Sequence, residues 1–212
     1  MERNEYHNLD CMEGMKQFPD KYFELAIVDP PYNISNNASR HGGSGKLKNR
    51  ILNKGSFKME VWDKVPTKEY FTELFRISKH QIICGGNYFP LPPTRGIICW
   101  DKYQPFENFS RWEMLWTSFD CPAKMFGFDN RTKGKIHPTE KPIELYEWLL
   151  KHYAKQGDKI LDTHVGSGSS IIAFEKHGFE YCGYEIDKDY YDSSKKRIEK
   201  HRELLQQEVI FK

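Results

Sequence analysis

The chain has 212 residues with a formal net charge of +2; 38% of the residues are hydrophobic and 15% are aromatic. This length suits one domain with its own core. No apolar run approaches the ~18 residues that span a bilayer, and the polar start, Met1 to Glu5, lacks the apolar segment of a secretory signal. We therefore expect a cytoplasmic protein with no membrane partner.

The cysteines predict neither a metal centre nor a disulfide framework. Their number is odd, and none is spaced from another like the paired thiolates of structural zinc sites. We expect reduced, mostly buried side chains and no bound metal. The five cysteines are Cys11, Cys84, Cys99, Cys121 and Cys182.

Along the chain, short apolar runs alternate with segments of helical periodicity. The alternation predicts an α/β fold, a mostly parallel twisted sheet with helices on both faces. Ligands of such sheets bind at the carboxyl ends of the strands, where several of these runs meet a carboxylate or a glycine turn. The predicted strands are 23–28, 81–84, 96–100, 112–117, 159–161 and 181–184, and the predicted helices are 69–77, 142–153, 168–178 and 190–207.

Directly after the first predicted strand stands Asp29-Pro30-Pro31-Tyr32. The two prolines remove two backbone donors and fix two φ angles. The neighbouring carbonyls and the Asp29 carboxylate therefore form a rigid group of acceptors beside the flat Tyr32 ring. Such a group can hold an amino group while a base stacks on the ring. Alone, the pattern is equally compatible with a proline-terminated turn capped by an aspartate.

The next segment, residues 33–59, is basic, with six lysines or arginines and no acidic residue. Its glycines, asparagines and serines predict a loop, and its charge suits a polyanion. On composition alone, a solvated surface loop is the simpler interpretation. The basic residues are Arg40, Lys46, Lys48, Arg50, Lys54 and Lys58.

A second motif runs from Asp162 to Ser170, between a predicted strand and a predicted helix. Its Gly166 and Gly168 allow a tight turn with close approach of a ligand to the backbone, and the helix start supplies free N–H groups. Glu185, at the end of the next strand, can accept hydrogen bonds from ribose hydroxyls. No lysine or arginine stands between Leu161 and Glu175. We therefore favour an adenosine that carries an amino acid over a dinucleotide.

Together these motifs resemble the β class of DNA amino-methyltransferases, in which the catalytic motif precedes the cofactor motif. Asp29 to Tyr32 matches the class signature Asp/Ser/Asn-Pro-Pro-aromatic, and Asp162 to Ser169 resembles its loop Asp-Pro-Phe-x-Gly-Ser-Gly-Thr. Residues 8–15 resemble its Gly-Asp-Cys segment, and residues 137–142 resemble its His-Pro-Thr-Gln-Lys-Pro segment. Within the class, the turn at residues 85–89 is most similar to that of small phage and prophage adenine methylases.

The resemblance implies a single Rossmann-like methyltransferase domain over residues 1–212. The basic loop, an insertion at about 33–59, directly follows the catalytic tetrapeptide, and this position favours contact with DNA over a solvated surface loop. It implies transfer of a methyl group from S-adenosylmethionine to the N6 amine of a flipped-out adenine in double-stranded DNA, as in restriction-modification, within a bacterial cell or a phage-infected host. The implied catalytic residues are Asp29, Pro30, Pro31 and Tyr32.

The resemblance also implies the residues that bind the cofactor and the DNA. Lys141 would neutralise the carboxylate of the cofactor. The implied cofactor-binding residues are Asp10, Cys11, Asp29, Thr139, Lys141, Pro142, Asp162, Val165, Gly166, Gly168, Ser169, Ser170, Glu185 and Ile186, and the DNA-binding residues are Arg40, Lys46, Lys48 and Arg50.

Some features depart from the class or leave alternatives open. Thr163 and His164 replace the usual Pro-Phe, which alters the expected packing beside the cofactor. The same chemistry on the N4 amine of cytosine stays an alternative, although the aspartate at position 29 favours adenine. Another alternative is a catalytically silent nucleic-acid-binding protein of this fold. The expected assembly is a monomer or a homodimer.

Overall fold

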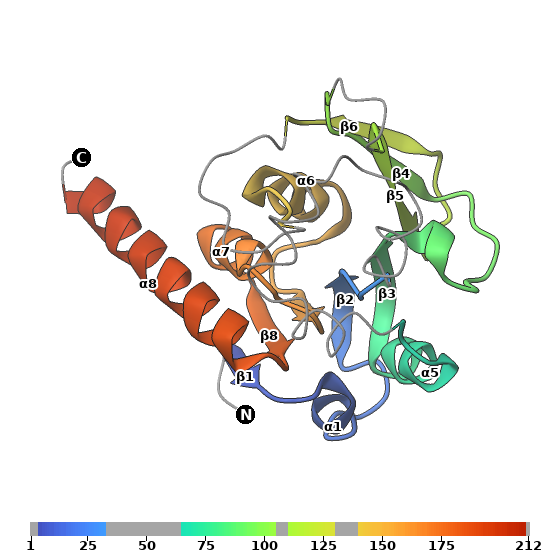
Figure 1. Ribbon diagram of the computed structural model, residues 1–212, viewed down its shortest axis with the longest axis horizontal. Coiled ribbons are helices and arrows are strands. Elements are labelled where there is room, and N and C mark those ends of the chain that lie inside the picture. Colours follow the sequence, from blue (N-terminus) through green and yellow to red (C-terminus); the bar gives the residue numbers. More distant parts are fainter. Residues whose placement is uncertain (1–3, 33–64, 105–109, 130–139, 211–212) are drawn as a thin grey trace, which may run out of the picture.

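A single eight-stranded sheet forms the centre of the protein (Figure 1). The computed structural model describes residues 4–32, 65–104, 110–129 and 140–210, except for the side chains of 208–210. The strand order is β1-β8-β7-β2-β3-β5-β4-β6. The strands are β1 (Glu5–Asn8), β2 (Phe23–Val28), β3 (Ser78–Cys84), β4 (Ile97–Asp101), β5 (Trp112–Thr117), β6 (Lys124–Gly127), β7 (Lys159–Asp162) and β8 (Glu180–Glu185).

The sheet is parallel over most of its width. β1, β8, β7, β2 and β3 form four consecutive parallel pairs. β5 then runs antiparallel to both β3 and β4, and β6 is parallel to β4. The predicted mostly parallel sheet is thus confirmed, and the reversal at β5 is an addition to it. Because of that reversal, the first residues of β5 lie at the same edge of the sheet as the last residues of β3 and β4.

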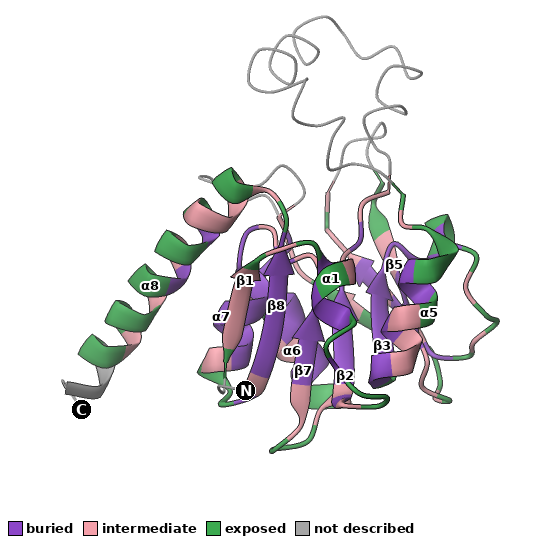
Figure 2. Ribbon diagram, turned by 90° about the horizontal axis from the view of Figure 1, so that it is seen from below, coloured by how far each residue is buried: buried purple, intermediate pink, exposed green. Residues whose placement is uncertain are grey.

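Helices cover both faces of the sheet, as predicted (Figures 1 and 2). One hydrophobic cluster joins α6 and α7 to the sheet, and a second cluster joins α1 and α5 to the opposite face. The last helix, α8, packs by its N-terminal part near the β1 edge, and its far end projects away from the sheet (Figure 1). The helices are α1 (Cys11–Met15), α5 (Lys68–Ile77), α6 (Ile143–Tyr153), α7 (Ser169–Lys176) and α8 (Lys188–Ile210), with a 3-10 turn η1 (Gly86–Tyr88).

Three elements were not predicted: β1, α1 and β6. Each has only four or five residues, so none contains enough apolar positions for a clear period. Among the described residues, no helix has both the length and the apolar character that a membrane span needs.

Candidate active site

The parallel strands bring their carboxyl ends, and the residues that follow them, to one edge of the sheet. Asp162 and Glu185 are the last residues of β7 and β8, and Asp29 follows β2 directly. Asp10 follows β1, which pairs with β8. Four acidic residues singled out in the sequence therefore gather at this edge. More than a hundred residues of the chain separate Asp29 from Asp162.

The turn between β7 and α7 is tied to the end of β8. The Gly166 N–H donates to Glu185 Oε2 at 2.9 Å, and the Asp187 N–H donates to Glu185 Oε1 at 2.8 Å. Gly166 and Gly168 have φ values of +55° and +82°, the left-handed region that glycine adopts without strain. The tight turn expected from Gly-x-Gly is therefore present, and Glu185 fixes its position.

Asp162 is a buried carboxylate of which one oxygen lacks a hydrogen-bond partner among the described residues. The whole residue is only 1% exposed. Oδ1 accepts the His164 N–H at 2.9 Å, whereas Oδ2 makes no hydrogen bond of normal geometry within the described part of the chain. Ser170 Oγ, which approaches this carboxylate, is in the same state. Burial raises the pKa of Asp162 to about 7. An oxygen in this state is suited to a donor from a ligand, above all a cationic one.

The two residues that depart from the β-class loop pack against α5. Tyr70 Oη lies 2.7 Å from Thr163 Oγ1, which lies 2.9 Å from His164 Nδ1. The His164 ring stands edge-on to Tyr70, with the ring centroids 5.4 Å apart. Burial lowers the pKa of His164 to about 4, so the ring is neutral near pH 7. Tyr70 thereby becomes a support of the loop, a role that its sequence position did not indicate.

Asp29 is held on both sides by donors of the chain itself. The Tyr32 hydroxyl donates to Asp29 Oδ1, and the Lys141 ammonium donates to Asp29 Oδ2. Lys141 Nζ also lies 3.1 Å from Glu113 Oε1 and 3.2 Å from the Tyr32 hydroxyl. Lys102 Nζ binds the other side of Glu113, at 2.9 Å from Oε2. We call Asp29, Lys102, Glu113 and Lys141 the charge cluster.

The charges of this cluster determine one another. Burial favours the uncharged forms of Asp29, Glu113 and Lys141, but neighbouring opposite charges outweigh it for two of them. Lys141 and Lys102 lower the pKa of Glu113 to about 2, and the two carboxylates raise the pKa of Lys141, whose residue is 4% exposed. For Asp29, burial dominates and raises the pKa, while Lys141 acts against the rise. The Asp29 carboxylate is thus less firmly ionised than Glu113 or Lys141.

The position of Lys141 differs from the predicted one. The resemblance placed it on the carboxylate of a cofactor, whereas here it binds Asp29 and Glu113. Its assignment to the cofactor stays a prediction. Glu113 and Lys102 were not predicted as site residues at all.

An aromatic stack lies against Tyr32. The Tyr88 ring is stacked on it, with centroids 5.0 Å apart and planes 17° apart, and Tyr88 is 52% exposed. The centroid of the Phe89 ring lies 5.9 Å from that of the Tyr32 ring. Gly85, with φ +64°, passes so close that a Cβ there would overlap the Tyr32 ring. The turn at residues 85–89 therefore shapes the wall of the site around Tyr32.

Other predicted cofactor residues lie around this edge in different states. Asp10 accepts the Met12 N–H at 2.8 Å and caps α1, and Cys11 is buried, which raises its pKa to about 12. The Ser169 hydroxyl bonds Arg197 at 2.9 Å. Pro142 precedes α6, Val165 is buried, and Ile186 is exposed. The predicted residues Arg40, Lys46, Lys48, Arg50 and Thr139 lie outside the described residues.

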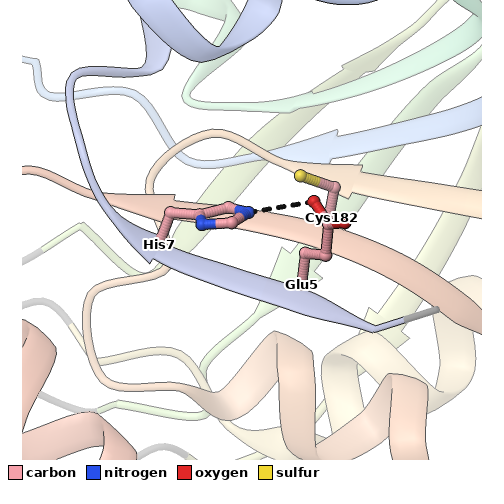
Figure 3. Close-up of side chains that lie close together, drawn as sticks. All are labelled: Glu5, His7 and Cys182. Atoms are coloured by element: carbon pink, nitrogen blue, oxygen red, sulfur yellow. Dashed lines mark hydrogen bonds and ion pairs between the residues drawn. The ribbon is translucent and has the colours of Figure 1, made fainter. Parts of the chain in front are cut away.

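The structure also brings together Glu5, His7 and Cys182, on the β1–β8 pair (Figure 3). Their ligand-type atoms lie within 4.8 Å of one another, a proximity that the cysteine spacing did not predict. His7 Nε2 and Glu5 Oε2 already bond each other at 3.0 Å, and burial raises the pKa of the Cys182 thiol to about 12. The hydrogen bond between His7 and Glu5 and the protonated Cys182 thiol explain why these three side chains lie together. All five cysteines are free, and three of them are buried, as predicted.

Comparison with known proteins supplies a family for this arrangement. A sequence model of the family N6_N4_Mtase, described as DNA methylase, matches residues 60–196. The Type II methyltransferase M2.DpnII of Streptococcus pneumoniae is 37% identical, over 92% of this chain and 89% of its own length. The Type II methyltransferase M2.MboI of Moraxella bovis is 25% identical, over 94% of this chain and 89% of its own length.

Solved structures share the fold. The crystal structure of the M1.HpyAVI–SAM complex has a TM-score of 0.61 at 19% identity and covers 91% of this chain and 98% of its own. The PvuII DNA methyltransferase, described as cytosine-N4-specific, has a TM-score of 0.62 at 13% identity and covers 96% of this chain and 91% of its own. These likenesses confirm the predicted Rossmann-like methyltransferase fold.

The buried Asp162 carboxylate predicts a pH-dependent stability. Its raised pKa means that the folded state binds this proton more tightly than the unfolded chain, so the free energy of unfolding falls as pH rises from about 4 to about 7. Asp162→Asn removes this dependence. In urea unfolding, we expect the variant to gain roughly 2–4 kcal/mol relative to wild type between pH 4.5 and pH 8. The exposed Asp120→Asn variant is the control, and an equal effect of Asp162→Asn at both pH values would contradict the assignment.

The contact of Gly85 with Tyr32 predicts that Gly85→Ala displaces the tyrosine. The matched control is Gly157→Ala, because Gly157 has φ +93° and a Cβ there would meet no atom within 4 Å beyond its chain neighbours. Both variants should lose about 1–2 kcal/mol of stability from the left-handed backbone. Only Gly85→Ala should also lose DNA-methylating activity, by roughly tenfold or more, at temperatures where it remains folded. Equal activities of the two variants would show that the Tyr32 position is unimportant.

Proposed function

Since the chain belongs to the DNA methylase family N6_N4_Mtase, we propose that it transfers a methyl group from S-adenosylmethionine to the N6 amine of adenine in double-stranded DNA. The observation that carries this proposal is the position of Asp29 and Tyr32 after β2, beside the ends of β7 and β8. The Asp29 carboxylate, which can accept an amine, and the Tyr32 ring lie beside the glycine turn between β7 and α7. The carboxylates of Asp162 and Glu185 are buried at this turn.

The residues present fit S-adenosylmethionine. Asp162 Oδ2 has no partner within the described part of the chain and suits the cationic amino group of the cofactor. Glu185, 8% exposed and held by two N–H groups, retains lone pairs for ribose hydroxyls. When bound, the cofactor supplies an electrophilic methyl group on a sulfonium. Asp10, Cys11, Thr139, Lys141, Pro142, Val165, Gly166, Gly168, Ser169, Ser170 and Ile186 complete the proposed binding site.

The proposed target base leaves the duplex and stacks on Tyr32, because an amine inside a base pair cannot reach a buried carboxylate. Asp29 and the Pro30 carbonyl accept the two hydrogens of the amine. This pairing directs the nitrogen lone pair toward the methyl group, and the prolines keep the acceptors rigid. Position and preorganised charge then supply most of the rate, and no covalent intermediate forms. The nitrogen that gains the methyl group loses one proton, which the Asp29 carboxylate is placed to accept.

Adenine is the finer part of the proposal. The aspartate at position 29 and the resemblance to adenine methylases support it. The fold does not discriminate between the bases, since the cytosine-N4-specific PvuII enzyme shares it. Cytosine N4 methylation is therefore the second candidate. The β class and the phage or prophage type stay predictions.

We also propose that residues 33–59 contact DNA phosphates through Arg40, Lys46, Lys48 and Arg50, within one catalytic domain over 1–212. The protein would act in the cytoplasm as a monomer or homodimer, in a restriction-modification setting like that of Type II methyltransferases.

Long-read methylation mapping of DNA from cells that express the chain tests the base and the site together. We expect N6-methyladenine in one short sequence context. Asp29→Ala should lower the rate roughly 10²-fold or more, because it removes an acceptor of the transition state. Cofactor binding, measured by calorimetry, should stay nearly intact. N4-methylcytosine would replace the adenine assignment, and an Asp29→Ala rate near that of wild type would contradict the mechanism.

The raised pKa of Asp29 predicts an acid limb in the rate profile. Asp29 must be ionised to accept the amine hydrogens, so activity should rise with pH through a range above the ordinary aspartate value of about 3.9. The measurement is kcat/KM for DNA against pH at saturating cofactor, with DNA binding followed in parallel. A profile that stays flat from about pH 5 to pH 8 would mean that the pKa of Asp29 is not raised.

A further inference from the structure

Both oxygens of the Asp29 carboxylate already have donors. Tyr32 occupies Oδ1 and Lys141 occupies Oδ2. In the proposed reaction, an amine N–H must also reach one of these oxygens. Each oxygen has a second lone pair, but a second donor on the same oxygen competes with the bond already made. Tyr32 belongs to the same tetrapeptide, and its ring is fixed by Tyr88, Phe89 and the close approach of Gly85. Lys141 is therefore the donor with which the amine competes for Asp29.

The neutral amine of the base competes poorly with the Lys141 ammonium for the Asp29 carboxylate unless a second partner also holds the ammonium. Lys141 is 4% exposed, so an unpaired charge at its position would be strongly unfavourable. Glu113 Oε1 lies 3.1 Å from Lys141 Nζ, and its side chain is only 13% exposed. Glu113 is thus placed to keep the ammonium paired after it leaves Asp29.

We propose that Glu113 is a positioning residue for methyl transfer: it retains the Lys141 ammonium when the substrate amine takes the place of that ammonium on Asp29. This inference rests on the proposed function and adds to it a residue that does not touch the reacting atoms. Lys102, 2.9 Å from Glu113 Oε2, holds the glutamate in place from its far side.

The surroundings of Asp29 define what the loss of Glu113 would do. The titratable groups that face Asp29 come from several elements: Lys141 before α6, Glu113 of β5, Cys84 of β3, Asp162 of β7, Tyr70 of α5, Tyr146 of α6 and its own neighbour Tyr32. The charge cluster has two cations and two carboxylates. Without the charge of Glu113, one positive charge is in excess, and Lys141 binds Asp29 alone. The Asp29 carboxylate then becomes harder to protonate, and the amine of the base competes less well with Lys141 for it.

The test compares Glu113→Gln with Glu175→Gln. Glu175 is the matched control because its side chain is 14% exposed and pairs with Arg202 between α7 and α8, away from the site. For Glu113→Gln, we expect kcat/KM for DNA to fall roughly tenfold or more, as for the loss of a charged hydrogen bond. The dissociation constants of cofactor and DNA should change less than about twofold. The acid limb should move to lower pH. Glu175→Gln should lower only the thermal midpoint.

Two further variants separate a charge effect from a packing effect. Lys141→Met removes the cation between Asp29 and Glu113 and leaves Glu113 paired with Lys102 alone, so the acid limb should move to higher pH. Adding Glu113→Gln to Lys141→Met should return the limb toward wild type, whereas two packing defects would only add. Glu113→Asp, which keeps the charge, should recover part of the activity, and it serves also if Glu113→Gln folds poorly.

The outcomes distinguish this inference from the proposed function. A wild-type protein that methylates no DNA amine overturns both. Wild-type activity with Glu113→Gln indistinguishable from Glu175→Gln overturns the role of Glu113 alone. So does an acid limb that stays fixed in Glu113→Gln, or one that does not return in the double variant.

Discussion

The parallel pairing of β7 with both β2 and β8 is the constraint on which the site depends. It places Asp162 between the residue that follows β2, Asp29, and the last residue of β8, Glu185. The chemistry of the site is thus divided between segments far apart in the sequence, and only the register of three neighbouring strands brings them together. The apolar residues of these strands, all buried between two layers of helices, maintain that register.

The charge cluster and the Asp162 carboxylate place ionised or ionisable groups where burial is unfavourable. A buried ion pair is weak support for stability, because desolvation offsets much of the attraction between the charges. Asp162 even retains an oxygen without a partner in the described part of the chain. Such groups are common where ligands bind, since the ligand supplies the missing partner. The protein holds its acceptors ready at some expense of its own stability.

Much of the architecture was predictable because it depends on local patterns. Apolar runs gave six of the strands, and helical periodicity gave α5, α6, α7 and α8 to within a few residues. Glu113 was not predictable as a site residue, because its place depends on the direction of β5, which no local pattern encodes. The contact of Lys141 with Asp29 depends likewise on how α6 packs. The stack of Tyr88 on Tyr32 follows from the left-handed backbone at Gly85, and the motif around that glycine indicated a turn without showing what lay beneath it.

The occupied state of Asp29 has a consequence for fidelity. Without substrate, the carboxylate is no vacant, hydrated acceptor, because Lys141 and Tyr32 already satisfy it. A base that arrives must therefore compete with Lys141 for Asp29. Thymine presents a flat ring but no exocyclic amine, so the methyl acceptor would be missing. Lys141 would then compete with every candidate base for the Asp29 carboxylate, so the protein would discriminate between bases before methyl transfer.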